Sequence, residues 1–201
     1  GTPAAPKVDG APDAAAAAEG LGLTADLLAA GGKLYRKHCQ QCHNLVGDGR
    51  GPSGFGSASP PRDFRRGAFK FVSTGHGLKP RRADLVRTLG EGLKGTIMPS
   101  FGLLPEGERE LMARYVTYLA VRGETEYQAL AAHLGAGDPA VPPASRVRPI
   151  LTQWEQAEQA PTVPAAPDDG EPGSALHNEA VRRGSALFTA KAENSCVTCH
   201  E

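Results

Sequence analysis

Two copies of one short pattern contain all four cysteines of this 201-residue chain. Each copy has the order Cys-x-x-Cys-His, and the six residues are Cys39, Cys42, His43, Cys196, Cys199 and His200. On a helix, positions i, i+3 and i+4 share one face. Two thiols and an imidazole on one face suit a flat ligand held by two thioether bonds and one bond to iron. Each motif therefore predicts a covalently attached haem c.

Two other uses of paired cysteines fit the sequence less well. A zinc ribbon places its Cys-x-x-Cys pairs about 15 to 20 residues apart, whereas about 150 residues separate these pairs. Zinc also gives no reason for a histidine to follow both pairs. A thioredoxin-like dithiol requires a βαβ setting, and the neighbouring sequence is helical and glycine-rich. Haem remains the interpretation that uses all six residues.

The iron of the first haem needs a second axial ligand, and the chain has only two methionines. Met112 lies in an amphipathic helical pattern, which favours a core position. Met98 lies in the loop GTIMPSFGLLP between two expected helices, where a thioether could reach the far face of the haem. We predict Met98 as this ligand, with His76 as the reserve candidate. His38 and His133 are not expected to bind the iron.

Composition indicates a helical chain with long connections. Aromatic residues make up only 5% of the sequence, and a haem plate would supply apolar surface that the core lacks. The 25 glycines and 17 prolines predict extended loops. No run of 18 apolar residues is present, so we expect no transmembrane helix. The chain starts at Gly1 without a hydrophobic leader, and we expect any export signal or anchor to have been removed or to lie outside this sequence.

Charge is unevenly distributed along a chain whose formal net charge is zero. Residues 31–123 carry 16 Lys and Arg against 7 Asp and Glu, a balance of +9, whereas both flanks are acidic. A cluster of one sign can steer docking with a partner of the opposite sign. The equally weighted alternative is an ordinary solvated surface. The segment GEGLKG follows a helix instead of a strand, so a nucleotide site is not expected there. No nucleic-acid partner is expected.

The helical periodicity divides the chain into four parts. We expect a haem-binding helix from about Ala30, a helix around RRADLVRTLGEGL, and a closing helix from Pro105 that stops at Gly123. Trp154 is expected to pin the following linker onto a domain surface. The predicted parts are a flexible tether at 1–27, a first domain at 28–123, a helix plus Pro-rich linker at 124–175, and the first helix of an incomplete second unit at 176–201.

Residues 31–123 resemble a class I cytochrome c domain. The resemblance rests on KLYRKHCQQCHNLVGDGRGP, GTIMPSF and ERELMARYVTYLAVRG, and PRDF, FKFVST and DLVRTLGEGLKGTIMPSF extend it to bacterial multidomain cytochromes with two such units. It implies an all-α fold, haem on Cys39 and Cys42, and axial His43 and Met98. It also implies that the first helix packs near Tyr115 of the last. The second unit departs from the family pattern, because the given sequence has no distal ligand or closing helix after His200.

The expected function is electron transfer without catalysis, because both axial positions of the first haem would be filled. The expected partners are redox proteins with an acidic docking surface, in a respiratory chain or a larger membrane-associated complex. The resemblance implies a periplasmic or outward-facing location. One alternative is a diheme enzyme, peroxidase-like or sulfur-compound oxidising, with an open site on the second iron. Another is a docking subunit in which haem is secondary.

Overall fold

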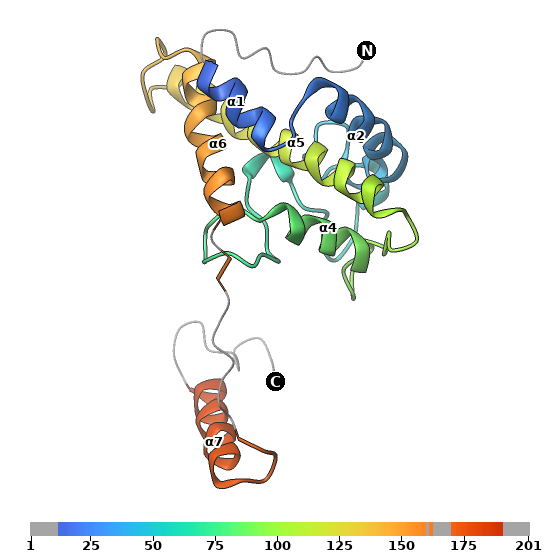
Figure 1. The fold of residues 1–201 in the computed structure, drawn as a ribbon, viewed down its shortest axis with the longest axis vertical. Helices are drawn as coiled ribbons and strands as arrows, with labels where there is room; N and C mark the ends of the chain where they lie inside the picture. The colour runs from blue at the N-terminus through green and yellow to red at the C-terminus, as the bar shows by residue number, and fades with distance from the viewer. Residues whose placement is uncertain (1–11, 160, 163–169, 191–201) are drawn as a thin grey trace. The chain divides into compact units, whose positions relative to one another are not determined.

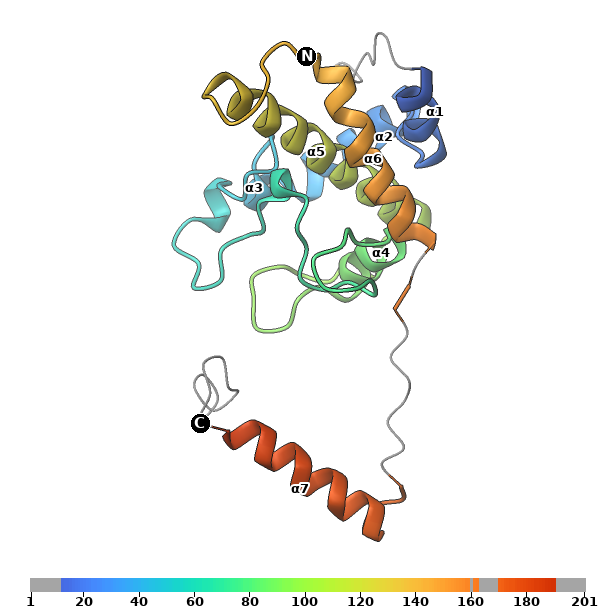
Figure 2. The same cartoon turned by 90° about the vertical axis from the view of Figure 1, so that its left-hand side faces the viewer.

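The computed structural model describes residues 12–159, 161–162 and 170–190 of the chain. Within these residues the fold is all-α, as predicted, with seven α-helices and two short 3₁₀ helices (Figures 1 and 2). The chain divides into two compact units, residues 1–162 and 163–201. In the described part, no helix is long and apolar enough to span a membrane.

The first unit is built on the crossing of α2 (Ala25–His38) and α5 (Glu106–His133). Gly31 and Gly32 make the crossing close: a Cβ on Gly31 would overlap a main-chain carbonyl oxygen of α5, and one on Gly32 would lie 2.9 Å from the Tyr115 ring. The ring centroids of Tyr35 and Tyr115 are 5.1 Å apart. The packing of the first helix against Tyr115 that the resemblance implied is therefore confirmed.

Helix α4 (Arg82–Glu91), which lies within the predicted segment RRADLVRTLGEGL, also packs on α5 and buries Leu85 and Leu89. The start of α4 is fixed by Asp84, whose side chain is 1% exposed. Its carboxylate accepts hydrogen bonds from the backbone N–H and hydroxyl of Ser73 and from the Arg81 N–H, at 2.9 to 3.1 Å. This buried acid ties the preceding loop to the helix.

Two expected helix boundaries are wrong, and both involve glycine. Helix α2 begins at Ala25 instead of Ala30, because Gly31 and Gly32 face α5 and remain helical. Helix α5 continues through Gly123 to His133. A Cβ on Gly123 would lie 2.5 Å from the Arg65 Cα, so this glycine permits close packing and does not end the helix.

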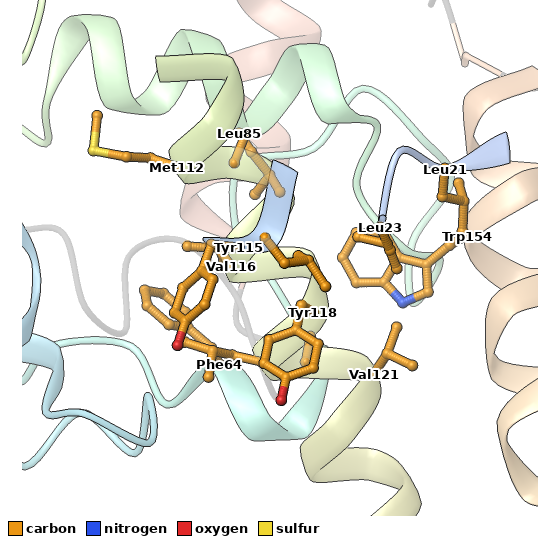
Figure 3. Close-up of a cluster of buried hydrophobic side chains, with 14 of the residues drawn as sticks. Leu21, Leu23, Phe64, Leu85, Met112, Tyr115, Val116, Tyr118, Val121 and Trp154 are labelled. Atoms are coloured by element: carbon orange, nitrogen blue, oxygen red, sulfur yellow. The ribbon is translucent and has the colours of Figure 1, made fainter. Parts of the chain in front are cut away.

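Residues 12–27 and 143–159 are also more ordered than the predicted tether and linker. Helix α1 (Pro12–Gly20) buries Ala14 and Ala17, and it packs beside α6 (Pro143–Gln159), which in turn packs on α5 (Figure 1). Trp154 of α6 is 2% exposed and faces Leu23 and Val121 in the core (Figure 3). Trp154 therefore anchors α6 to the core, in line with its predicted role. Residues 12–20 of the predicted tether form α1, as suits an alanine-rich segment, because alanine is the strongest helix former.

The second unit contains α7 (Ala175–Thr189), which begins where the Ser174 hydroxyl accepts a hydrogen bond from the His177 N–H at 3.1 Å. A helix was predicted from this region into the second Cys-x-x-Cys-His motif. The helix instead ends at Thr189, because Ala190 adopts an extended backbone conformation. Cys196, Cys199 and His200 lie outside the described residues, so their assignment stays a prediction.

Candidate haem site

The first Cys-x-x-Cys-His motif lies at the end of α2. The helix stops at His38, Cys39 forms the turn, and the short helix α3 (Gln40–His43) carries the rest of the motif. The N–H groups of Cys42 and His43 both donate to the Cys39 carbonyl oxygen, at 3.1 and 2.9 Å. One tight turn therefore holds both thiols and the imidazole, as the spacing predicted.

The His43 ring is oriented by a hydrogen bond from the far side of the following loop. Its Nδ1 lies 3.1 Å from the carbonyl oxygen of Arg62. A carbonyl oxygen can only accept, so Nδ1 carries the proton and Nε2 keeps its lone pair. An imidazole held in this tautomer is ready to bind a metal through Nε2, and the hydrogen bond makes it a more basic ligand.

Phe64 completes the support of His43. It opens the 3₁₀ helix η2 (Phe64–Arg66), and its ring stacks on the imidazole with centroids 4.3 Å apart and 19° between the planes. His43 is 8% exposed, and this burial lowers the pKa of the imidazole, while the hydrogen bond to the Arg62 carbonyl opposes the effect. The ring is therefore neutral at pH 7, the form that ligates iron.

Glycines let the loop between α3 and η2 wrap closely around the motif. Gly49 has φ +74°, and a Cβ there would overlap the Pro61 carbonyl oxygen. A Cβ on Gly51 would lie 2.6 Å from the Cys42 carbonyl carbon. The Gly51 N–H donates to that same carbonyl group at 3.0 Å. This wrapping brings the backbone of residue 62 back to His43.

Met98 lies in a loop that is held by its own hydrogen bonds and tied to α4, where the Phe101 N–H donates to the Leu89 carbonyl oxygen at 2.8 Å. The Met98 carbonyl oxygen accepts from the Leu93 N–H at 3.1 Å, and the Met98 N–H donates to the Thr96 hydroxyl at 3.1 Å. The Met98 side chain is half-buried and packs against the edge of the core. This loop and the loop after α3 both project from the side of the unit away from α6 (Figure 2).

The second methionine and the histidines outside the first motif are less suitable as ligands than Met98. Met112 is fully buried in the core near Leu85 (Figure 3), as predicted. His76 and His133 are exposed. The His38 ring lies edge-on to Phe101, with centroids 5.9 Å apart. Met98 therefore remains the candidate thioether ligand.

Comparison with known proteins identifies this region. Residues 26–116 match the family described as cytochrome c oxidase, cbb3-type, subunit III. These residues form a class I c-type cytochrome domain. A chain of the Kuenenia stuttgartiensis reducing HAO-like protein complex is 30% identical over 45% of this chain and 41% of its own length, with a TM-score of 0.44. No curated protein sequence matches the chain.

A cytochrome domain of this class carries a covalent haem c, and the residues of this structure fit one. Cys39 and Cys42 are free thiols, and His43 has a free Nε2 beside them. The loop after α3 and the loop around Met98 also expose apolar side chains. These side chains are Phe55, Ile97 and Leu103. The haem supplies one-electron chemistry at its iron.

The sequence did not indicate that Arg62 and Phe64 support the cytochrome's histidine. Arg62 acts through its backbone carbonyl, which any residue would provide. The one available signal is PPRDF, since Pro60 and Pro61 restrict the backbone just before this carbonyl.

The two thiols of the cytochrome domain are expected to differ in reactivity before haem is attached. Burial, reinforced by the neighbouring Cys42, raises the pKa of the Cys39 thiol to about 12. Because the thiolate is the nucleophile, Cys39 should react with iodoacetamide at pH 8 at least about tenfold more slowly than the half-buried Cys42. Peptide mapping by mass spectrometry at timed intervals measures the two rates. Equal rates in the folded haem-free protein would contradict this assignment.

Proposed function

We propose that this chain is an electron-transfer c-type cytochrome that passes single electrons between redox partners. Haem would be bonded to Cys39 and Cys42, with His43 and Met98 as the axial ligands. The observation that carries the proposal is the contact between His43 Nδ1 and the Arg62 carbonyl, which leaves Nε2 free for iron. With both axial positions filled, electrons would enter and leave through the exposed haem edge.

We further propose a second haem at Cys196 and Cys199 with His200 as its ligand. The support is the repeat of the motif and the helix α7 before it. The chain would then be a diheme cytochrome of a respiratory chain or a larger complex. The expected location is the periplasm or the outward-facing side of a bacterial membrane.

The surface around the first haem suits an acidic redox partner. Arg50, Arg62 and Lys94 are exposed in the two loops that project from this side of the domain. The exposed Phe55 and Leu103 lie in the same loops. An apolar centre with cations around it favours docking that is steered by charge.

Haem content tests this function directly. We expect the mass of the native chain to include two haem groups that remain after denaturation and acidic extraction. The double variant Cys39→Ser/Cys42→Ser should lose one haem, and Cys196→Ser/Cys199→Ser should lose the other. A wild-type chain without covalent haem would exclude the function.

Carbon monoxide separates an electron carrier from an enzyme with an open iron site. The haem at His43 should show no spectral change when the reduced protein is exposed to carbon monoxide, because Met98 fills the sixth position. The Cys196→Ser/Cys199→Ser variant isolates this haem for the measurement. A carbon monoxide adduct in that variant would contradict the proposed ligation.

A further inference from the structure

We propose that the buried ion pair between Lys79 and Glu124 positions His43 and thereby helps to set the potential of the haem iron. The inference rests on the proposed haem at His43. It concerns two residues that lie outside the motif and contact neither thiol.

The first step is the ion pair itself. Lys79 Nζ lies 2.5 Å from a carboxylate oxygen of Glu124, and the two side chains are 9% and 17% exposed. Lys79 also lies beside the Trp154 ring, with Nζ 6.0 Å from its centroid. Burial raises the pKa of Glu124, and the ammonium group of Lys79 opposes this. Burying such a pair costs solvation, so the pair is not explained by a gain in stability alone.

The second step is the contact between this pair and η2. Lys79 Nζ also donates to the Gly67 carbonyl oxygen at 3.2 Å. Gly67 ends η2 with φ +59°, and a Cβ there would overlap both the Glu124 carboxylate and Lys79 Nζ. The pair therefore contacts the end of η2 at a residue whose positive φ favours glycine.

The third step leads from η2 to the ligand. Phe64 at the start of η2 stacks on His43, and the carbonyl that orients the imidazole belongs to Arg62, two residues earlier. Phe64 also stacks on Phe69, with centroids 6.0 Å apart, and Phe69 meets Trp154 of α6 edge-on. Lys79 and Glu124 thus fix the C-terminal end of η2 at Gly67. The N-terminal end of η2, at Phe64, contacts His43.

The expected effect on the iron follows from ligand basicity. A firm Nδ1–H···O=C bond makes the imidazole a stronger donor, which favours ferric iron. Loosening η2 should weaken this bond and raise the midpoint potential. Removing both charges together keeps the net charge constant. A change in the midpoint potential would then reflect the position of His43 and not a change in charge near the iron.

The test compares the double variant Lys79→Met/Glu124→Met with a control double variant at another ion pair of α5, the helix that carries Glu124. The control is Arg122→Gln/Glu126→Gln, which removes an exposed ion pair of 2.6 Å. We expect the buried-pair variant to raise the potential of the His43 haem and to speed solvent exchange of the His43 Nδ1 proton by about tenfold. The control variant should change neither quantity. Proton NMR measures the exchange, and redox titration of the Cys196→Ser/Cys199→Ser background measures the potential.

The outcomes separate this inference from the proposed function. Haem bonded to Cys39 and Cys42, with an unchanged potential and unchanged proton exchange in the variant, would overturn the inference alone. Absence of haem in the wild type would overturn the function. Exchange of the His43 Nδ1 proton, compared between the haem-free wild type and the haem-free variant, would still decide whether the ion pair positions His43. If the double variant does not fold, Glu124→Gln replaces it: faster exchange supports the role, and exchange at the wild-type rate refutes it.

Discussion

Met98→Ala is expected to lower the midpoint potential of the first haem by a few tenths of a volt. A thioether ligand favours ferrous iron and raises the potential, and axial ligation moves haem potentials over about 0.8 V. The loop around Met98 is fixed by the bonds to Leu93 and Thr96. The variant should therefore lose the ligand while the loop keeps its backbone.

Two measurements check the Met98 prediction. Redox titration gives the potential, and the weak near-infrared band of a methionine–iron bond should disappear from the oxidised protein. Carbon monoxide should now bind the reduced haem, because the sixth position becomes accessible.

Met112→Leu is the matched control for Met98→Ala. It also removes a methionine sulfur, but from a fully buried core position, and this volume-conserving change should cost less than about 1.5 kcal/mol of stability. The potential and the near-infrared band should stay as in the wild type. If Met98→Ala left the potential unchanged and His76→Ala altered it, His76 would be the ligand.

The motif itself could be predicted from the sequence because its chemistry is local. Cys39, Cys42 and His43 lie within one turn, so their spacing alone places them together. The support of His43 could not be predicted in the same way. Arg62 acts through a main-chain atom 19 residues from the ligand. Such a contact depends on the path of the loop and not on the type of side chain, so no sequence pattern marks it.

The errors at the helix boundaries have a common physical source. A glycine in a helical pattern can mark a stop or a close approach, and the sequence does not distinguish the two. At Gly123 the deciding fact is the Arg65 backbone packed against it. The alanine-rich segment of α1 has a similar ambiguity, since its low amphipathicity hid a strong intrinsic helix propensity. Only its packing beside α6 shows that it belongs to the first unit.

Gly31→Val should destabilise the first unit by about 3 kcal/mol, because the side chain would meet the α5 backbone. The overlapping atom is the Leu111 carbonyl oxygen, which cannot move aside as a flexible side chain could. The two helices must separate or the valine must distort α2. Chemical denaturation of the haem-loaded protein measures the change in the free energy of unfolding.

Gly107→Ala is the control for the glycine prediction. Gly107 lies in α5, and a Cβ there would have no neighbour within 4 Å. This change should be neutral or stabilising by up to about 1 kcal/mol, since alanine has the higher helix propensity. Equal effects of the two substitutions would contradict a close crossing at Gly31.

The crossing at Gly31 should also affect the haem site, because α2 connects the two. Tyr35 packs on Tyr115 of α5, and its hydroxyl donates to the Asn44 carbonyl oxygen at 2.7 Å. Asn44 follows His43 directly and has φ +61°, a conformation that the surrounding bonds must maintain. A displaced α2 would shift the Tyr35 hydroxyl that bonds to Asn44, the residue after His43. Gly31→Val should therefore change the midpoint potential as well as the stability. A stability loss with an unchanged potential would show that the helix crossing and the ligand turn are independent.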